Sequence, residues 1–457
     1  MKLSIDNIIK YTLLLILVVV CIYTILYIYY TKRLDNINSN HYINNSINNS
    51  INNSINNSNL TDIKNNVIPK PEILMYYCSK YKLNEPIKKS LEDLNIGITK
   101  DISETQLYFP CGFNKVEVEL NKLRFIDDIP LVEQKTIQNT KHNIKQHNEF
   151  KNKVIMGIPG CDKLCSKNSI WDLLKKEYGF DDAGKIMPMT FIINEPQDLM
   201  MLNDIEQESQ SKLHNNVYIL KNNNQGKKGL YMTNNISRLI NEDKTRLKEY
   251  KVIQKYITNP YLINKRKLNI RLYVLIYNIR DSETQWYLYN KGKCIYNNKD
   301  YNVNTSLLEH NLQDKEQHFT SLNLDTYNIY STLGNPESLE DLKQHFGEEN
   351  YNYIMYKIIN KLRSIKYVYN KNSILQNQDN LKNNTTIQYF GIDIILNDEL
   401  EPYILEFNKG PEMKYKSPQD EELKTQFMFN IFKVSKALYK TQYRTVDDIL
   451  NKCFTDI

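Results

Sequence analysis

One stretch near the C-terminus decides the fold: Phe390-Gly-Ile-Asp-Ile-Ile-Leu-Asn-Asp-Glu-Leu-Glu-Pro-Tyr-Ile-Leu-Glu-Phe-Asn408. Two apolar segments flank an Asn397-Asp398 turn, which predicts a β-hairpin. Asp393 lies on the first strand, and Glu406 and Asn408 lie two apart on the second, so the latter two share one face. Pairing of the strands can bring the three oxygen-bearing groups together, and such ligands suit Mg²⁺ with nucleotide phosphates. A core strand has no structural need for these groups, because burying them unpaired is costly. A surface hairpin with stray carboxylates is the alternative.

The composition is that of a globular protein, with 41% hydrophobic and 25% charged residues in a chain of 457 residues. This length has room for two or three domains. The net charge of +6 is a weak excess without a basic block, so we expect no nucleic-acid partner, and an acidic protein partner is tolerated. Only Cys161 and Cys165 are close among seven scattered cysteines, which predicts reduced thiols and no zinc site.

An apolar, uncharged run over residues 11–30 is long enough to span a bilayer core. Lys10 precedes it, Lys32-Arg33 follow it, and tyrosines gather at its C-terminal end as at a membrane interface. A cleaved signal peptide is the alternative, but the run lacks a clear small-residue cleavage site. These features predict a membrane anchor over 1–32 in a single-pass protein, whose orientation the nearly balanced flanking charges leave open.

The following segment, predicted as a linker over 33–70, is rich in asparagine: 14 of the 31 residues from 36 to 66 are Asn. A polar, repetitive segment of this kind cannot bury enough apolar surface to fold, which predicts a flexible tether. Its repeats contain sequons at Asn44, Asn48, Asn52 and Asn56, which could be glycosylated on a lumenal side. Chance is the alternative in so Asn-rich a tract.

Alternating strands and helices are expected from residue 151 onward, while 71–150 carries no motif that we can assign. Strands are predicted at 217–220, 252–257 and 268–278, a hairpin at 286–289 and 293–296 around Lys291-Gly292, and amphipathic helices at 351–365 and 421–439.

Basic residues recur at strand ends and along strand faces. Lys221 ends an apolar strand and precedes the loop Gly226-Lys-Lys-Gly229, which could hold a polyphosphate, although the spacing is not that of a Walker loop. Val252-Ile-Gln-Lys-Tyr-Ile257 could line an adenine slot. A lysine-rich turn and an ordinary edge strand are the respective alternatives.

A second basic pattern lies on the strand that follows. Lys267, Asn269 and Arg271 alternate with apolar residues and therefore point to one face. Two cations on one strand face repel each other unless an anion, such as a phosphate or a carboxylate, lies between them. A solvated strand face is the alternative.

The order of these segments resembles the ATP-grasp fold, and specifically the tubulin–tyrosine ligase-like family, over about residues 152 to 440. The resemblance implies an α+β fold in which two α/β subdomains clamp ATP over 151–440, followed by a tail at 441–457. It is carried by Ile158-Pro-Gly-Cys-Asp-Lys-Leu-Cys-Ser-Lys167, Tyr218-Ile-Leu-Lys221, Val252-Ile-Gln-Lys-Tyr-Ile257, Arg266-Lys-Leu-Asn-Ile-Arg271, Gln317-His-Phe-Thr-Ser321, Gly391-Ile-Asp393 and Leu405-Glu-Phe-Asn408.

The resemblance also implies ATP and Mg²⁺ as cofactors and a role for each matching residue. Nucleotide contacts are expected from Lys167, Lys221, Gln254, Lys255, Tyr256, Ile257, Lys267 and Thr320. Catalytic roles are expected from Lys267, Arg271 and Glu406, with Arg271 facing the reacting carboxylate or the incoming amino acid. Magnesium ligands are expected from Asp393, Glu406 and Asn408.

Three positions depart from the family pattern. The family usually has Asp where Asn269 stands, Arg where we align Asn290, and Asn where Ser321 stands. ATP binding is therefore better preserved than the grip on the acceptor or amino acid.

The implied activity is ligation of a free amino acid (tyrosine, glutamate or glycine) to a carboxylate of an acidic protein tail, such as that of tubulin, through an acylphosphate. A domain that modifies tubulin must face the cytosol. The alternatives are a catalytically weakened protein that binds nucleotide or tubulin, a membrane scaffold, and a membrane-anchored glycosyltransferase. The last would need an acidic Asp-X-Asp element, and we find no credible one.

Overall fold

The structure is a computed structural model. It describes residues 71–112 apart from 79 and 81, and then 152–211, 216–222, 229–279, 283–306, 308–320, 325–372 and 384–457. Contacts within the chain separate Met1–Lys70 from Pro71–Ile457, and the described residues belong to the second of these units. They form a mixed α+β fold, which confirms the predicted class.

The prediction of a single-pass membrane protein is corrected by the structure. No helix within the described residues is long and apolar enough to cross a bilayer. The longest of them, α14 (Glu348–Asn372) and α15 (Pro418–Tyr439), carry charged residues along their length and pack on a sheet. The predicted anchor, linker and sequons lie outside the described residues, as do Ser321 and all of the loop 226–229 except Gly229.

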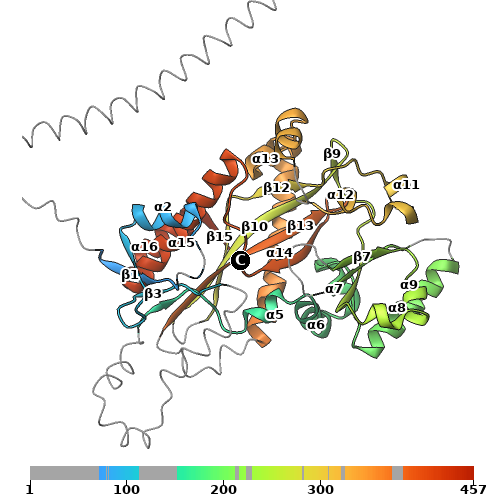
Figure 1. Ribbon diagram of the computed structural model, residues 1–457, viewed down its shortest axis with the longest axis horizontal. Coiled ribbons are helices and arrows are strands. Elements are labelled where there is room, and N and C mark those ends of the chain that lie inside the picture. The colour runs from blue at the N-terminus through green and yellow to red at the C-terminus, as the bar shows by residue number, and fades with distance from the viewer. Residues whose placement is uncertain are drawn as a thin grey trace, which may run out of the picture. The chain divides into compact units, whose positions relative to one another are not determined.

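A large mixed sheet forms the centre of the unit (Figure 1). Its strand order is β15-β11-β10-β13-β4-β3-β1-β2, with β9 and β12 also paired with β10, and β14 paired with β13. The antiparallel pair of β13 and β14 confirms the predicted hairpin. The strands are β1 (Ile73–Tyr76), β2 (Ile96–Thr99), β3 (Leu107–Tyr108), β4 (Val154–Ile155), β9 (Leu262–Ile263), β10 (Arg266–Ile279), β11 (Gln285–Tyr289), β12 (Lys293–Tyr296), β13 (Thr385–Leu396), β14 (Pro402–Asn408) and β15 (Phe454–Asp456).

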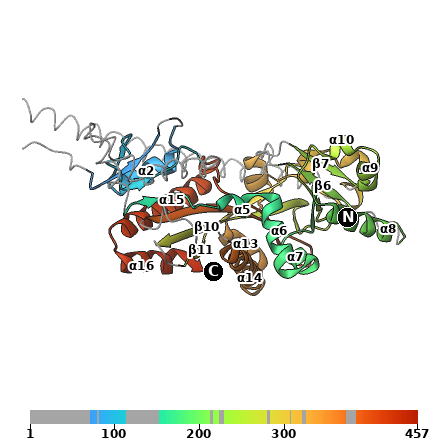
Figure 2. The same cartoon turned by 90° about the horizontal axis from the view of Figure 1, so that it is seen from below.

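Helices cover both faces of this sheet, so the side chains of β10 alternate between two apolar cores. Ile270 and Leu272 belong to the core that includes α14, whereas Tyr273 and Leu275 belong to the core that includes α15. Figure 2 shows α14 and α15 on opposite sides of β10. Lys267, Asn269 and Arg271 therefore lie on the same face of the sheet as Tyr273, which is the face that carries α15.

A second, smaller sheet contains only antiparallel pairs, in the order β5-β8-β6-β7. One face packs on α8 (Pro196–Ser211) and α9 (Ile236–Asn241) through Phe191, Tyr218 and Ile253. The other face places Ile219 and Met232 against Leu312, Phe319 and neighbouring residues. The strands are β5 (Thr190–Ile192), β6 (Tyr218–Lys221), β7 (Leu230–Thr233) and β8 (Val252–Lys255).

The remaining helical segments cover these sheets and connect their strands. They are α2 (Glu85–Asp93), α5 (Cys161–Cys165), α6 (Lys167–Tyr178), α7 (Phe180–Ile186), α8 (Pro196–Ser211), α9 (Ile236–Asn241), α10 (Lys244–Leu247), α11 (Val303–Ser306), η3 (Glu309–Asn311), α12 (Lys315–His318), η4 (Tyr327–Thr332), α13 (Leu339–Phe346) and α16 (Tyr443–Cys453). The segment expected as a C-terminal tail thus contains α16 and β15, and β15 pairs with β11.

The hairpin predicted around Lys291-Gly292 is wrong. Both β11 and β12 pair with β10, over Val274–Tyr277 and Leu268–Arg271 respectively, so they follow each other along one edge of that strand. A Cβ atom at Gly292 would lie 2.7 Å from the carbonyl oxygen of Arg271. Gly292 therefore allows the segment between β11 and β12 to approach the backbone of β10 closely. Glycine commonly has this role where two backbones come close together.

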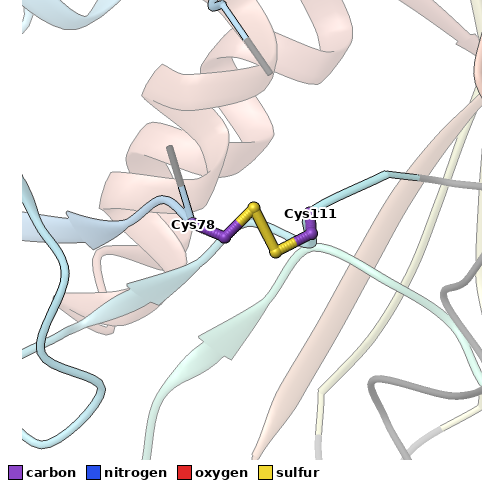
Figure 3. The surroundings of a disulfide bond; sticks show 2 residues. All are labelled: Cys78 and Cys111. Atoms are coloured by element: carbon purple, nitrogen blue, oxygen red, sulfur yellow. A yellow bond between two sulfur atoms is a disulfide. The ribbon is translucent and has the colours of Figure 1, made fainter. Parts of the chain in front are cut away.

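The prediction that the cysteines are reduced is wrong for one pair. Cys78 and Cys111 form a disulfide with their Cα atoms 5.4 Å apart (Figure 3). They follow β1 and β3, which pair parallel with Tyr76 opposite Tyr108, so the two cysteines leave adjacent strand ends. A separation of 33 residues in the sequence gives no sign of this contact.

Candidate active site

A row of four charged side chains crosses the large sheet where β12, β10, β13 and β14 lie side by side. Lys293 lies opposite Arg271, Arg271 opposite Asp393, and Asp393 opposite Glu406. Cross-strand partners share one face of a sheet. All four residues line one cleft with a volume of about 440 Å³. One wall of this cleft thus carries two bases beside two acids.

A β-bulge in β14 sets this register. Ile394 lies opposite Ile404, so a regular ladder would place Leu405 opposite Asp393. The bulge inserts one residue, and Glu406 takes that position instead. Bulges re-aim side chains in this way beside functional sites. The bulge therefore makes the two carboxylates direct neighbours.

The acids of the row already have basic partners. The Arg271 guanidinium donates hydrogen bonds from Nε and Nη2 to the two Asp393 carboxylate oxygens, with Nη2–Oδ2 at 2.9 Å. Burial lowers the pKa of Arg271, but the charge of Asp393 and the hydrogen bonds to it outweigh burial and raise the pKa above its ordinary value. Glu406 lies 3.6 Å from the Lys167 ammonium at the start of α6, which is a looser ion pair. The Asn408 amide lies 3.5 Å from Glu406.

Two lysines, Lys221 half-buried and Lys267 buried, line the same cleft without a carboxylate partner in the described part of the chain. The Lys221 ammonium donates to the Gln254 side-chain oxygen at 2.6 Å. Lys267, which is 3% exposed, donates to the Tyr256 hydroxyl and to the His318 carbonyl oxygen. Burial lowers the pKa of Lys221 to about 8, and burial together with the charge of Lys221 lowers the pKa of Lys267 to about 7. An anion in the cleft would relieve this cost.

Neutral side chains hold the two ammonium groups in place. Gln254 also donates to the Thr190 hydroxyl at 2.9 Å, so both ends of its side-chain amide are engaged. The Tyr256 hydroxyl lies 3.0 Å from His318 Nδ1, and the Lys267 ammonium lies 4.3 Å from the centre of the Tyr256 ring. The lysines are thus preorganised rather than mobile surface charges.

An apolar surface adjoins these lysines within the same cleft. Ile219 and Leu230 from the small sheet line it, together with Ile257, which follows β8. The backbone N–H groups of Lys255 and Tyr256 already donate to carbonyl oxygens of the protein. A flat aromatic ring could lie against the apolar side chains, with its edge toward the strand.

The Lys293 end of the cleft contains a cluster that the sequence reasoning missed. Asp420 on α15 accepts hydrogen bonds from Lys293 at 2.8 Å and from Lys424 at 2.9 Å. Glu337 and Ser417 also line the cleft, and the Ser417 hydroxyl donates to Glu337. Ser417 three residues before Asp420 could have predicted the start of a helix. It could not have predicted that this start lies beside Arg271.

All candidate residues named from the sequence line this one cleft. They are Lys167, Lys221, Gln254, Lys255, Tyr256, Ile257, Lys267, Arg271, Thr320, Asp393, Glu406 and Asn408, and Asn269 joins them. Asn290 is outside the cleft lining and accepts a hydrogen bond from Thr455 at 2.7 Å. Its position therefore contributes no side chain to the site.

Oxygen atoms dominate the possible metal ligands. Among the residues that the structure describes, no group of three or more His, Cys, Asp and Glu side chains is placed so that it could hold a metal ion. Asp393 and Glu406 together with the Asn408 amide would make a set of oxygen donors, which is the kind that Mg²⁺ uses.

Comparison with known proteins agrees with the resemblance seen in the motifs. A model of the tubulin-tyrosine ligase family matches residues 142–444. The chain is 27% identical over 321 residues to a probable beta-tubulin polyglutamylase of Tetrahymena thermophila, covering 65% of this chain and 24% of that protein. It is 28% identical over 234 residues to tubulin glycylase 3C of the same organism, covering 48% and 20%. It is 24% identical over 290 residues to a human tubulin polyglutamylase, covering 60% and 30%. The chain thus spans less than a third of the length of these relatives, and it belongs to the tubulin-tyrosine ligase family.

Proposed function

We propose that the protein is an ATP- and Mg²⁺-dependent ligase that joins an amino acid to a carboxylate of an acidic protein tail. One observation carries the proposal: Lys221 and Lys267, which have no acidic partner among the described residues, line one cleft together with a pair of neighbouring carboxylates. We assign the cleft to an ATP-grasp arrangement, in which the small sheet and the large sheet hold the nucleotide between them.

The lysines fit a polyphosphate. Lys221 and Lys267 come from different sheets and line the same cleft, so one chain of phosphates could contact both. Phosphate oxygens would give both ammonium groups charge-assisted hydrogen bonds. The purine would lie on the apolar surface at Ile219 and Ile257. Thr320, which is buried at the cleft, would lie near the nucleotide.

The acidic pair fits a divalent cation. Like charges directly opposite each other on two strands destabilise a sheet. Arg271 compensates Asp393, whereas Lys167 compensates Glu406 only loosely at 3.6 Å. Glu406, Asp393 and Asn408 would hold Mg²⁺, which would neutralise charge on the transferred phosphoryl group.

The residues of the cleft suit acyl activation followed by amide formation. First the terminal phosphoryl group of ATP passes to a carboxylate oxygen, so that ADP leaves and an acylphosphate forms. An amine nitrogen then attacks the acyl carbon, the bond to phosphate breaks, and the amine loses a proton. Lys221 and Lys267 would stabilise charge on the phosphoryl oxygens, and Arg271 would orient the anionic substrate.

The acceptor is inferred from the relatives. Their names describe polyglutamylases and glycylases of tubulin. Tubulin, or another protein with an acidic tail, is therefore the acceptor that we propose, with glutamate, glycine or tyrosine as the added amino acid.

A protein that binds nucleotide and acceptor without ligating them is the second candidate. Two observations favour it: Asp393 is already paired with Arg271, and Asn290 contributes nothing to the cleft. Ligation and binding must therefore be measured separately.

The test is incorporation of radiolabelled amino acids into tubulin by the full-length protein with Mg·ATP. We expect incorporation of one amino acid, and Glu406→Gln should abolish it without unfolding the protein, because the neutral amide is a poorer metal ligand. Glu399→Gln, at the exposed turn of the same hairpin, is the matched control and should remain active. Binding of Mg·ATP without incorporation of any amino acid would refute the ligase and favour the second candidate.

A further inference from the structure

We propose that Lys293 and Arg271 form a carboxylate subsite, which holds a substrate carboxylate that does not itself react. The subsite lies on the far side of Arg271 from the proposed metal ligands. This proposal rests on the proposed function, because the carboxylate belongs to a substrate of the proposed ligase. The carboxylate belongs either to the free amino acid or to the acceptor tail.

The first argument is the pairing of like charges. Lys293 and Arg271 are direct cross-strand partners, and both line the cleft. Side chains in this relation lie close together, and two cations so placed destabilise the sheet. The pair mirrors Asp393 and Glu406 on the next two strands, where two acids are direct partners. Two neighbouring acids favour a cation, and two neighbouring bases favour an anion.

The second argument is the way in which Lys293 is held. Asp420 is 4% exposed and Lys424 is 2% exposed, so this ion cluster is buried. Asp420 accepts from both lysines and from the backbone N–H of Lys416 at 3.1 Å. One carboxylate thus fixes two ammonium groups and leaves the cluster with one excess positive charge. Burial, with the charge of Lys293, lowers the pKa of Lys424 to about 8, consistent with crowded cations.

Two further acids, Glu337 and Glu412, line this end of the cleft. Glu337 accepts a hydrogen bond from the Ser417 hydroxyl, and burial raises the pKa of its carboxyl group above the ordinary value. Glu412 is exposed at the rim of the cleft. Asp393 already pairs with Arg271 in a bidentate way, which leaves further N–H groups of the guanidinium for a ligand.

The third argument is reach. Adjacent strands lie about 4.8 Å apart, so the middle of the Lys293–Arg271 pair lies roughly 10 Å from the middle of the Asp393–Glu406 pair. A substrate that reacts beside the metal can therefore place a second carboxylate at Lys293.

The test measures binding by the full-length protein in the presence of Mg·ADP. The probes are free L-glutamate and a fluorescent peptide of consecutive glutamates. Lys293→Met should weaken binding of one probe about 10- to 100-fold, because a charge-assisted hydrogen bond to a carboxylate is lost. Lys293→Arg should restore most of the affinity. Lys299→Met removes an exposed lysine outside the cleft and should change nothing.

Each outcome decides the proposal. The weakened probe identifies the source of the carboxylate, provided that the affinity for Mg·ADP is unchanged. Equal affinities of Lys293→Met and wild type for both probes overturn the subsite, as does failure of the wild type to bind either probe. A parallel loss of Mg·ADP affinity indicates a structural role and also overturns it. Lys293→Gln retains a donor for Asp420 and decides the matter if the Met variant does not fold. Binding of a probe without any ligation refutes the proposed function alone.

Discussion

Binding of Mg·ATP should weaken as the pH rises, because Lys221 and Lys267 in the cleft have lowered pKa values and lose their protons near neutral pH. Burial and the charge of Lys221 lower the pKa of Lys267 to about 7, and burial lowers the pKa of Lys221 to about 8. Bound phosphates stabilise the charged forms and therefore raise both pKa values in the complex. The affinity for Mg·ATP is therefore highest below the pKa values of the two lysines in the free protein, and it falls as the pH rises through these values.

The magnitude follows from the two pKa values. For each lysine, the affinity for Mg·ATP falls by up to about tenfold per pH unit above the pKa of that lysine in the free protein. Between about pH 6.5 and about pH 8.5, Lys267 should contribute about 25-fold and Lys221 about fourfold, so the affinity should fall about 100-fold in total.

The assay is calorimetric titration with Mg·ATP at stepped pH, repeated in buffers of different ionisation enthalpy to count the protons taken up. Lys267→Met should bind more weakly throughout and retain only the fourfold dependence of Lys221. Lys299→Met, an exposed control, should follow the wild type. A wild-type affinity that is constant over this range, or an unchanged pH dependence in Lys267→Met, would refute the reasoning.

Three further predictions concern the acceptor grip and stability. Asn269→Asp restores the acid that the family usually has and should raise incorporation of an amino acid; no effect with any amino acid in the tubulin assay would count against that view. Gly292→Ala should lower the free energy of unfolding by about 1–3 kcal/mol, because its Cβ would lie 2.7 Å from the Arg271 carbonyl oxygen; an unchanged urea midpoint would contradict this. Cys78→Ser opens a loop of 33 residues and should cost about 3–4 kcal/mol by the chain-entropy model; the control is wild type with reductant, which should unfold at the same midpoint as the variant.

The alternation of polar and apolar residues along single strands predicts much of the site. The alternation of Lys267, Asn269 and Arg271 with apolar residues predicted one shared face, and all three line the cleft. The turn at Asn397-Asp398 predicted the hairpin that brings acids from two strands together. Such predictions succeed because strand geometry fixes the direction of every second side chain.

The remainder depends on contacts between distant segments. The bulge at Leu405 decides which residue faces Asp393, and nothing in the run Ile404-Leu-Glu-Phe407 announces it. Gly292 beside Lys293 is typical of a hairpin turn. In the structure, however, this glycine permits a close contact with β10. Asp420 lies 127 residues after Lys293 in the sequence, so only tertiary packing brings the two together.

The most direct test of the central claim is a crystal structure of the full-length protein with Mn²⁺ in place of Mg²⁺ and a non-hydrolysable ATP analogue. We expect an anomalous peak between Asp393 and Glu406, with the phosphates between it and the ammonium groups of Lys221 and Lys267. Nucleotide density in another part of the molecule, or metal bound away from Glu406, would contradict the account.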